Sequence, residues 1–178
     1  MSIVEKKLEE RIRYDGPIFQ VYSGTVELPN GKTAPRDRIA HSGGAGILPI
    51  DENGMVYLVR QYRYGVDKTL LEIPAGKLEP GEDPMKTAVR ELTEEVGFLP
   101  QEVTPLGYME LSPAYLGELT YLYLGRNLIP QKNDLDDDEF LEIVSLPFEQ
   151  ALQMVLSGEI TDGKTQNAIL KAAALLKK

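Results

Sequence analysis

The sequence predicts an α+β sandwich, in which strands fill the first part of the chain and helices close it. Three observations carry this prediction. Short segments of alternating apolar residues, separated by Gly and Pro turn signals, run to about residue 73. One segment with helical periodicity, 84–96, follows them, and two amphipathic segments, 148–157 and 164–177, come last. Because strands and helices do not alternate regularly, this order favours an α+β class over a parallel doubly wound sheet.

The composition of the chain is typical of a globular protein. Its 178 residues are 42% hydrophobic, enough to bury a core in one domain or in a main domain with a short appendage. The net charge of −9 argues against general binding to nucleic acid or to anionic membranes. The absence of cysteine excludes disulfides and thiolate chemistry. No segment has a signal-peptide core or membrane-spanning length, so we expect a protein of the cytoplasm.

The N-terminal residues 1–42 are expected to form a separate β element. The segment 18–28 alternates imperfectly, residues 29–32 (Pro-Asn-Gly-Lys) are a hairpin-turn signal, and a returning strand is predicted at 33–41. The remaining residues, 43–178, form the predicted main domain. Its strands are expected at 47–50, 55–61, 69–73, 108–111, 119–124 and 140–144.

The segment 84–96 is the most clearly predicted helix. Asp83 is suited to the N-cap, Pro84 to the first helical position and Gly97 to the C-terminal cap. One apolar stripe is expected to be buried, because its members recur at helical spacing. The stripe consists of Met85, Ala88, Val89, Leu92 and Val96.

The negative charge of the chain is concentrated in two short segments. Residues 79–95 hold six acidic and two basic residues, and residues 134–142 hold six acidic and no basic residues. Concentrated carboxylates repel one another and lower stability unless something cationic neutralises them. Taken alone, each segment is also typical of a solvated acidic surface.

The acidic residues of the predicted helix lie close together. Glu91 and Glu95 share a face with Glu94 beside them, and like charges at this spacing cost about 0.2–0.5 kcal/mol per pair. The helix dipole also disfavours an anion at Glu95, near the C-terminus. A hard cation would offset this cost, and carboxylate oxygens suit Mg²⁺ or Mn²⁺. The helix alone leaves a second interpretation open, an exposed acidic face braced by Arg90.

Fixed spacings connect this helix to the residues before it. Gly76 is followed after five residues by Glu82, and after seven more by residues 90–98, which read Arg-Glu-Leu-Thr-Glu-Glu-Val-Gly-Phe. This pattern resembles the signature of the Nudix hydrolases, GX5EX7REUXEEXGU with U apolar, and matches every specified position. We call residues 76–98 the Nudix box. The resemblance implies a Nudix-type α/β/α sandwich, here with an N-terminal β extension.

The resemblance also implies metal-assisted cleavage of a nucleoside diphosphate linked to another group. A bound divalent metal would polarise phosphorus–oxygen bonds and lower the pKa of a bound water. The implied cofactor is Mg²⁺, for which Mn²⁺ would substitute, and Arg90 and Glu94 are expected to act in catalysis. The implied metal ligands are the carbonyl of Ala75 and the carboxylates of Glu82, Glu91, Glu94 and Glu95.

Residues beyond the box resemble the ADP-ribose pyrophosphatase subfamily. Pro113 lies sixteen residues after Gly97, Ser112 precedes it, and Glu118 fits a frequent acidic position. Ala114 departs from the usual Ser-Pro-Gly and changes the backbone freedom of this loop. The resemblance implies that Ser112, Pro113 and Glu118 contact the substrate. It further implies hydrolysis of ADP-ribose to AMP and ribose 5-phosphate.

Four arginines are candidates for binding the substrate. Arg60 and Arg63 belong to an Arg-Gln-Tyr-Arg stretch, similar to one that the subfamily has near the diphosphate and terminal ribose. Alternation places these two on opposite sides of the strand. Arg36 and Arg38, on the returning N-terminal strand, would serve similarly, because the planar guanidinium matches phosphate oxygens. Each would otherwise be a solvated strand arginine.

The second acidic segment, 134–142, resembles the mobile acidic loop that supplies a catalytic glutamate in the subfamily. Glu139 is the first choice as general base and Glu142 the second. The alternative is a loop that only promotes solubility. The single histidine, His41, is expected to be structural.

The N-terminal extension implies, by the same resemblance, a homodimer in which this element contributes to the adenosine pocket. Phe19, Tyr14 and Tyr22 are candidates for stacking on the adenine or for packing. The expected partner is a small nucleotide-sugar substrate, with no nucleic acid and no membrane. Two alternatives stay open: a Nudix hydrolase of another nucleoside diphosphate sugar, such as GDP-mannose, and a Nudix-fold sensor that binds ADP-ribose without cleaving it.

Overall fold

The computed structural model describes residues 2–135 and 140–177, and the chain divides into two compact units. The smaller unit comprises Met1–Gly43 and Glu110–Leu119, and the larger unit comprises Gly44–Met109 and Thr120–Lys178.

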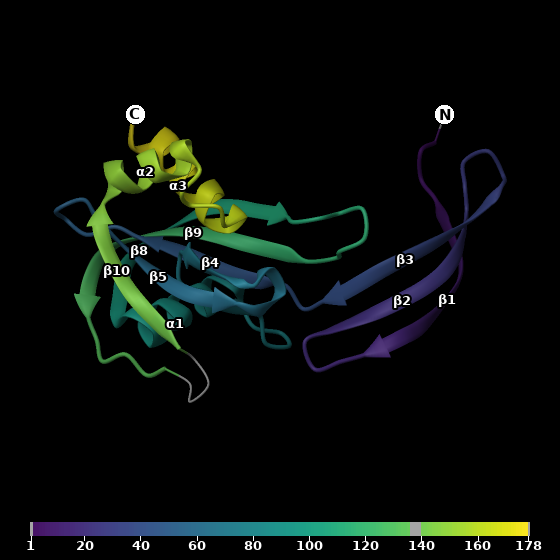
Figure 1. The fold of residues 1–178 in the computed structure, drawn as a ribbon, viewed down its shortest axis with the longest axis horizontal. Coiled ribbons are helices and arrows are strands. Elements are labelled where there is room, and N and C mark those ends of the chain that lie inside the picture. Colours follow the sequence, from purple (N-terminus) through teal and green to yellow (C-terminus); the bar gives the residue numbers. More distant parts are fainter. Residues whose placement is uncertain (1, 136–139, 178) are drawn as a thin grey trace. The chain divides into compact units, whose positions relative to one another are not determined.

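A three-stranded antiparallel sheet forms the body of the smaller unit. Its order is β1 (Lys6–Asp15), β2 (Phe19–Glu27) and β3 (Thr33–His41) (Figure 1). The β2–β3 turn contains Gly31, whose φ of 79° favours a residue without a side chain. The predicted hairpin and its returning strand are thus confirmed. β1 is rich in charged residues and almost wholly exposed, so its sequence carries no strong strand signal.

The segment Glu110–Leu119 joins the smaller unit through backbone hydrogen bonds. Ile39 donates its N–H to the Tyr115 carbonyl (2.7 Å), and Gly117 donates to the Ile39 carbonyl (2.9 Å). The sequence predicts this segment in the main domain, because no local pattern reveals a pairing between residues so far apart in the chain. The smaller unit therefore extends beyond the predicted element 1–42.

Two sheets form the larger unit. The first has the antiparallel order β10-β5-β6, and the second has the mixed order β7-β4-β9-β8, in which β4 and β9 run parallel. A short 3₁₀ turn, η1 (Tyr64–Val66), connects β5 to β6. The strands are β4 (Gly44–Pro49), β5 (Met55–Arg63), β6 (Lys68–Glu72), β7 (Ala75–Lys77), β8 (Phe98–Glu110), β9 (Leu119–Pro130) and β10 (Leu141–Pro147).

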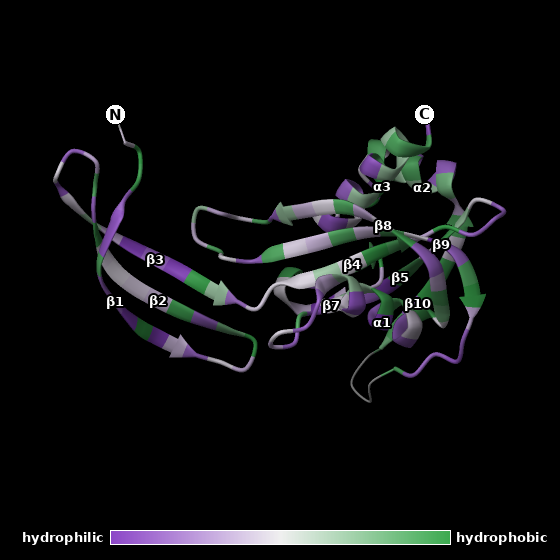
Figure 2. Ribbon diagram, turned by 180° about the vertical axis from the view of Figure 1, so that it is seen from behind, coloured by the Kyte–Doolittle hydropathy of each residue, from purple (hydrophilic) through white to green (hydrophobic). Residues whose placement is uncertain are grey.

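Helices cover the sheets of the larger unit from two sides (Figure 1). α1 (Pro84–Val96) packs into one hydrophobic cluster, whereas α2 (Phe148–Ser157) and α3 (Gly163–Leu176) pack into another. The neighbours Ile47 and Leu48 of β4 belong to different clusters, as the alternation of a strand requires. Figure 2 shows the hydrophobic residues gathered in these strands and helices. This arrangement confirms the predicted α+β sandwich.

α1 begins and ends where the sequence predicts, but its buried face is rotated from the predicted one. Leu92 is fully buried as expected, whereas Met85 is 43% exposed, so its predicted burial is wrong. Glu91 and Glu95 are buried instead. The face of α1 that packs against the sheets thus includes two carboxylates. The pattern of apolar residues alone does not reveal their burial.

The strands after the box are longer than predicted. β8 begins at Phe98 rather than near residue 108, and β9 continues to Pro130. β8 lies at the edge of its sheet and contains Pro100 and Pro105, which an edge strand tolerates because one side of its backbone has no strand partner. Its many exposed positions hide the alternation on which the sequence prediction depended.

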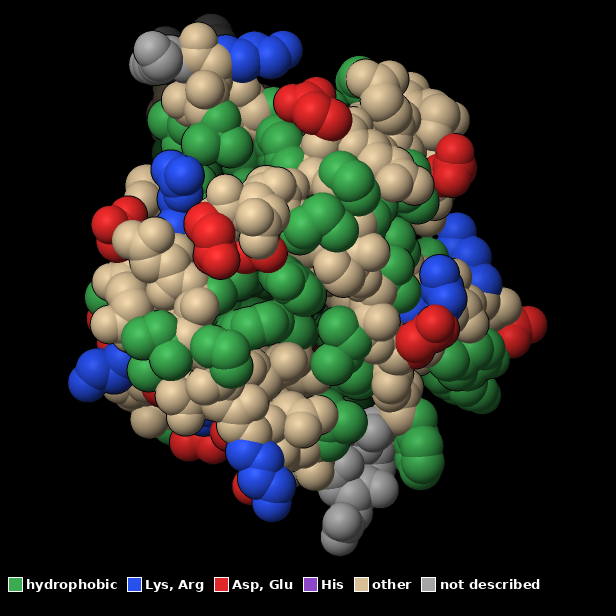
Figure 3. Space-filling view, turned by 90° about the vertical axis from the view of Figure 1, so that its left-hand side faces the viewer, with side chains coloured by type: hydrophobic (Ala, Val, Ile, Leu, Met, Phe, Trp, Pro, Cys, Tyr) green, Lys and Arg blue, Asp and Glu red, His purple; other side chains and the backbone are tan. Residues whose placement is uncertain are grey.

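The surface of the molecule mixes hydrophobic and charged side chains. On the face shown in Figure 3, acidic and basic residues are interspersed among hydrophobic ones. No helix in the part of the chain that the structure describes is long and apolar enough to cross a membrane.

Candidate active site

The loop and helix of the Nudix box have fixed ends. The Asp83 carboxylate accepts hydrogen bonds of 3.0 and 3.2 Å from two N–H groups of the first turn of α1, which confirms the predicted N-cap. At the other end Gly97 has a φ of 81°, and its N–H reaches two carbonyls of the last turn. The helix therefore starts and stops at defined residues, and this fixes the direction of its side chains.

Two carboxylates of α1 are buried against the start of β7. Glu91 is 8% exposed and Glu95 is 2% exposed. Glu95 Oε2 accepts a hydrogen bond from the Ala75 N–H (3.2 Å). A Cβ atom on Gly76 would stand 1.8 Å from Glu91 Oε1, a distance that no packed structure tolerates. A side chain at position 76 would therefore force the Glu91 carboxylate to move away.

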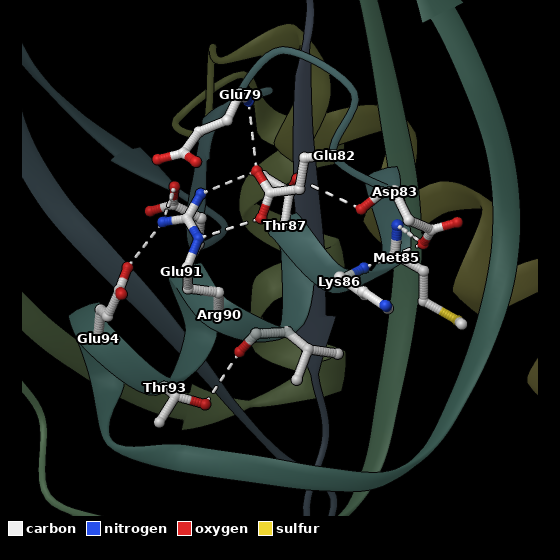
Figure 4. Close-up of polar contacts among 11 residues, drawn as sticks. Glu79, Glu82, Asp83, Met85, Lys86, Thr87, Arg90, Glu91, Thr93 and Glu94 are labelled. Carbon is white, nitrogen blue, oxygen red and sulfur yellow. Dashed lines mark hydrogen bonds and ion pairs between the residues drawn. The ribbon is translucent and has the colours of Figure 1, made fainter.

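Arg90 connects three carboxylates of the box (Figure 4). Its guanidinium nitrogens lie 3.3 Å from Glu82 Oε1, 2.9 Å from Glu91 Oε1 and 2.8 Å from Glu94 Oε2. Burial alone would lower the pKa of Arg90, but the hydrogen bond to Glu82 and the charges of Glu91 and Glu94 prevail and raise it. The hydrogen bond from Arg90 likewise lowers the pKa of Glu82. Arg90 therefore braces the box carboxylates, as one interpretation of the sequence proposed.

The donor atoms of the box fit a hard divalent cation. They are carboxylate oxygens and the carbonyl oxygen of Ala75, which are the kinds of ligand that Mg²⁺ and Mn²⁺ prefer. Because Gly76 has no side chain, the Glu91 carboxylate lies close to the backbone of this strand. Within residues 2–135 and 140–177, no three His, Asp or Glu side chains are arranged to enclose an ion. The fit therefore rests on the chemical type of the donors.

Two of the candidate arginines lie in β5, where burial alternates as predicted. Arg60 Nη1 donates to Glu142 Oε2 (2.7 Å). Arg63 donates two hydrogen bonds, of 2.7 and 2.8 Å, to Glu72, which is only 1% exposed. Both guanidinium groups thus have carboxylate partners, and their role toward a substrate stays a prediction.

The arginines of β3 pair with acidic residues from the start of the chain. Arg36 pairs with Glu5, and Arg38 donates two hydrogen bonds of 2.7 Å to Glu10. The Arg38 guanidinium also lies 4.0 Å from the centre of the Tyr22 ring, within the range of a cation–π contact. These contacts link β3 to β2, to β1 and to the residue before β1, and substrate binding by Arg36 and Arg38 stays a prediction.

Ser112, Pro113 and Glu118 belong to the segment that joins the smaller unit. The Ser112 carbonyl accepts hydrogen bonds of 3.1 and 2.8 Å from two N–H groups farther along, which makes a tight turn. Glu118 Oε1 lies 3.8 Å from His41 Nδ1, and the same nitrogen accepts a hydrogen bond from Gly43 N–H (3.1 Å). His41 therefore has local partners, in line with a structural role, while the roles of Ser112, Pro113 and Glu118 stay predictions.

The candidate bases differ in what the structure describes. Glu139 lies outside the described residues, so its assignment stays a prediction. Glu142 lies in β10, where its side chain is 65% exposed and pairs with Arg60. Glu142 is thus placed next to an arginine that we expect to meet phosphate oxygens.

One charged group beside the box was not found from the sequence. The buried Glu72 binds Lys164 as well as Arg63, and Lys164 also lies 3.2 Å from Asp162. Thr165, the next residue of α3, is fully buried. The one signal in the sequence was an acidic residue inside the apolar run 70–74 (Leu-Leu-Glu-Ile-Pro).

Comparison with known proteins agrees with this geometry. The family model described as the NUDIX domain matches residues 40–165. The chain is 38% identical over 170 residues to an ADP-ribose pyrophosphatase of Bacillus subtilis, covering 94% of this chain and 92% of that protein. It is 36% identical over 167 residues to a methanol dehydrogenase activator of Bacillus methanolicus, covering 93% and 90%. A GDP-mannose pyrophosphatase of an Enterobacter species is 33% identical, covering 92% of each chain.

The fold has a close structural counterpart as well. A crystal structure of an ADP compounds hydrolase superposes with a TM-score of 0.87 at 24% identity, covering 99% of this chain and 97% of the other. At this identity the likeness speaks for the fold alone. The family match and the curated relatives, together with the box residues carried by β7, the loop after it and the capped helix α1, show that this chain belongs to the Nudix family and is a Nudix hydrolase.

Proposed function

We propose that this chain hydrolyses the pyrophosphate bond of ADP-ribose to AMP and ribose 5-phosphate, with Mg²⁺ or Mn²⁺ as cofactor. The observation that carries the proposal is the grouping of the box carboxylates around Arg90 and against Ala75 and Gly76. ADP-ribose is supported by relatives named ADP-ribose pyrophosphatase, which align over 94% of the chain in Bacillus subtilis and 91% in Mycobacterium tuberculosis.

The proposed metal site explains why acidic residues would face a polyanionic substrate. A pyrophosphate would be repelled by the carboxylates of α1 unless cations lay between them. When bound, Mg²⁺ would neutralise the diphosphate, polarise its phosphorus–oxygen bonds and lower the pKa of a bound water. The proposed ligands are the Ala75 carbonyl and the carboxylates of Glu82, Glu91, Glu94 and Glu95.

The arginines have two proposed tasks. Arg90 orients Glu82, Glu91 and Glu94 through contacts of 2.8–3.3 Å and offsets part of their charge. Arg60 is proposed to bind the diphosphate, because its present partner Glu142 is an exposed carboxylate that phosphate oxygens would replace. Arg63 is proposed to act nearby, although its link to the buried Glu72 ties it more firmly to the fold.

A carboxylate from the acidic loop is proposed as general base. Glu139 is the first candidate and Glu142 the second, because a base must come within hydrogen-bond reach of a water near the diphosphate. The segment 134–142 contains no basic residue. Its carboxylates therefore repel one another unless cations neutralise them.

The smaller unit is proposed to form a homodimer and to contribute to the adenosine pocket. This is supported by large apolar side chains that the unit leaves exposed, among them Leu8 (48%), Ile12 (48%) and Tyr14 (51%). The Tyr14 and Phe19 rings lie 5.6 Å apart, a spacing typical of aromatic packing, and Tyr22 is already covered by Arg38. Tyr14 and Phe19 are therefore the better candidates for contact with adenine.

A second substrate class has support of its own. GDP-mannose pyrophosphatases of three bacterial groups align with this chain at 32–36% identity. The experiment is a panel of nucleoside diphosphate sugars at equal Mg²⁺, with release of the nucleoside monophosphate measured. We expect kcat/KM for ADP-ribose to exceed that for GDP-mannose by at least about tenfold. The reverse order would assign the chain to the second class.

A further inference from the structure

The connection between β6 and β7 brings the Ala75 carbonyl and Gly76 to the box. It is held from the side of α1, where Ala75 N–H donates to Glu95 Oε2 at 3.2 Å. It is also held by β4, because Ile47 N–H donates to the Pro74 carbonyl at 3.0 Å. A residue that fixes this connection therefore also fixes the candidate ligands.

A third contact comes from α3, far away in the sequence. Ile73 N–H donates a hydrogen bond of 2.8 Å to Thr165 Oγ1, and both residues are fully buried. The Thr165 hydroxyl donates its own proton to Asp162 Oδ2 at 2.6 Å. With its proton committed to Asp162, the hydroxyl oxygen can only accept from Ile73, so the direction of this contact is fixed.

The same end of α3 is anchored by charge. Asp162 caps the helix by accepting the Thr165 N–H at 2.9 Å, and it lies 3.2 Å from Lys164 Nζ. Lys164 in turn binds Glu72, the residue that precedes Ile73. Glu72, the last residue of β6, and Ile73, the first residue of the connection, are therefore tied to two adjacent residues of α3.

The contacts of this connection with α1 depend on where it lies. A Cβ built on Gly76 would stand 1.8 Å from Glu91 Oε1, so the carboxylate of Glu91 lies close to this stretch of backbone. A shift of the connection away from α1 would break the contact between Ala75 N–H and Glu95 Oε2. We propose that Thr165 is a positioning residue for the metal site: by accepting the Ile73 N–H, it sets the place of the Ala75 carbonyl relative to Glu91 and Glu95. This inference rests on the proposed function.

The test measures metal binding directly, without substrate. Thr165→Val keeps the shape of the side chain but removes the hydroxyl, whereas Thr165→Ser keeps the hydroxyl. Mn²⁺ is titrated into each protein, and free Mn²⁺ is followed by electron paramagnetic resonance. We expect Thr165→Val to weaken Mn²⁺ binding by at least about tenfold, the scale known for partners that orient metal ligands, and Thr165→Ser to restore it.

A matched control separates positioning from loss of stability. Ile169→Val removes one buried methylene from the same helix and leaves every hydrogen bond of Ile73 and Thr165 in place, so it should lower the thermal midpoint but leave Mn²⁺ binding unchanged. If Thr165→Val does not fold at room temperature, Thr165→Cys replaces it, because a thiol is a weak acceptor of similar size. The same weakening is expected.

The possible results separate the positioning role of Thr165 from the proposed metal-dependent function. Equal Mn²⁺ affinity in wild type and Thr165→Val, or equal weakening in Ile169→Val, overturns the positioning role of Thr165 and leaves the proposed function standing. A wild-type protein that binds no Mn²⁺ overturns the metal-dependent function itself, and the inference falls with it.

Discussion

At the scale of single residues, the backbone of β7 approaches the Glu91 side chain of α1 closely at Gly76. Gly76→Ala would place a methyl group 1.8 Å from Glu91 Oε1. We therefore expect this variant to weaken Mn²⁺ binding by about 10–100-fold, because Glu91 would have to turn away. Calorimetric titration of Mn²⁺ measures the effect.

Gly65→Ala is the matched control for this prediction. Its added Cβ would meet no atom within 4 Å, and the conformation of Gly65 is not one reserved for glycine. Gly65→Ala should bind Mn²⁺ like the wild type. A normal affinity in Gly76→Ala would show that Glu91 does not depend on this contact.

The general base is a second question at this scale. A positioned base typically contributes about 10²–10⁴-fold to the rate. Glu139→Gln is therefore expected to lower kcat by at least about 10²-fold with little change in KM. Glu142→Gln should have a smaller effect, because Glu142 pairs with Arg60. Steady-state kinetics of the two variants decides, and the opposite order would move the assignment to Glu142.

Individual site residues could be predicted from the sequence where spacing identifies them. The fixed spacing of the box predicts Glu82, Arg90, Glu91, Glu94 and Glu95 as site residues. Arg90 contacts Glu82, Glu91 and Glu94, and Glu95 contacts Ala75, while their roles stay predictions. Spacing did not reveal that Glu91 and Glu95 are buried, because burial of a charge depends on partners from other elements. For Glu95 this partner is the Ala75 N–H, which belongs to β7 and not to α1.

At the scale of elements, the link between β6 and α3 makes stability depend on pH. Burial would raise the pKa of Glu72, but Arg63 and Lys164 prevail and lower it below 4.5. A lowered folded pKa adds stability above the unfolded value, and this stability is lost as the pH falls through the folded value. Glu72 should therefore stabilise the protein at pH 7 and lose this effect in acid.

Glu72→Gln tests this dependence. At pH 7 we expect the free energy of unfolding to fall by about 1–3 kcal/mol, because two cations lose their buried partner. Urea unfolding at pH 7, 5 and 3 should show the difference between wild type and Glu72→Gln shrinking below about pH 4.5. A difference that stays constant with pH would mean that Glu72 stabilises by packing rather than by charge.

Elements with local signals were predicted well, and elements set by distant contacts were not. The caps at Asp83 and Gly97 placed α1, and the turn at Gly31 placed the β2–β3 hairpin. β8 was predicted too short because an exposed edge strand needs no alternation. The contact between Ile73 and Thr165 joins residues that no local pattern relates.

At the scale of the whole molecule, the smaller unit predicts self-association. Its exposed apolar side chains and separate sheet are expected to be covered by a second copy of the chain. Light scattering at micromolar concentration should give the mass of a dimer. Deletion of residues 1–40 should abolish the dimer and raise KM for ADP-ribose, whereas a monomeric full-length protein with normal KM would contradict this role.

The function proposed for the molecule is a metal-dependent hydrolysis at the Nudix box. The most direct measurement is the release of AMP from ADP-ribose by the wild type and by Glu95→Gln, each with Mg²⁺ and with a chelator. We expect the wild type to lose all activity in chelator and to regain it with Mg²⁺, and Glu95→Gln to fold normally with activity lower by orders of magnitude. Full activity in chelator, or an unimpaired Glu95→Gln, would contradict the mechanism.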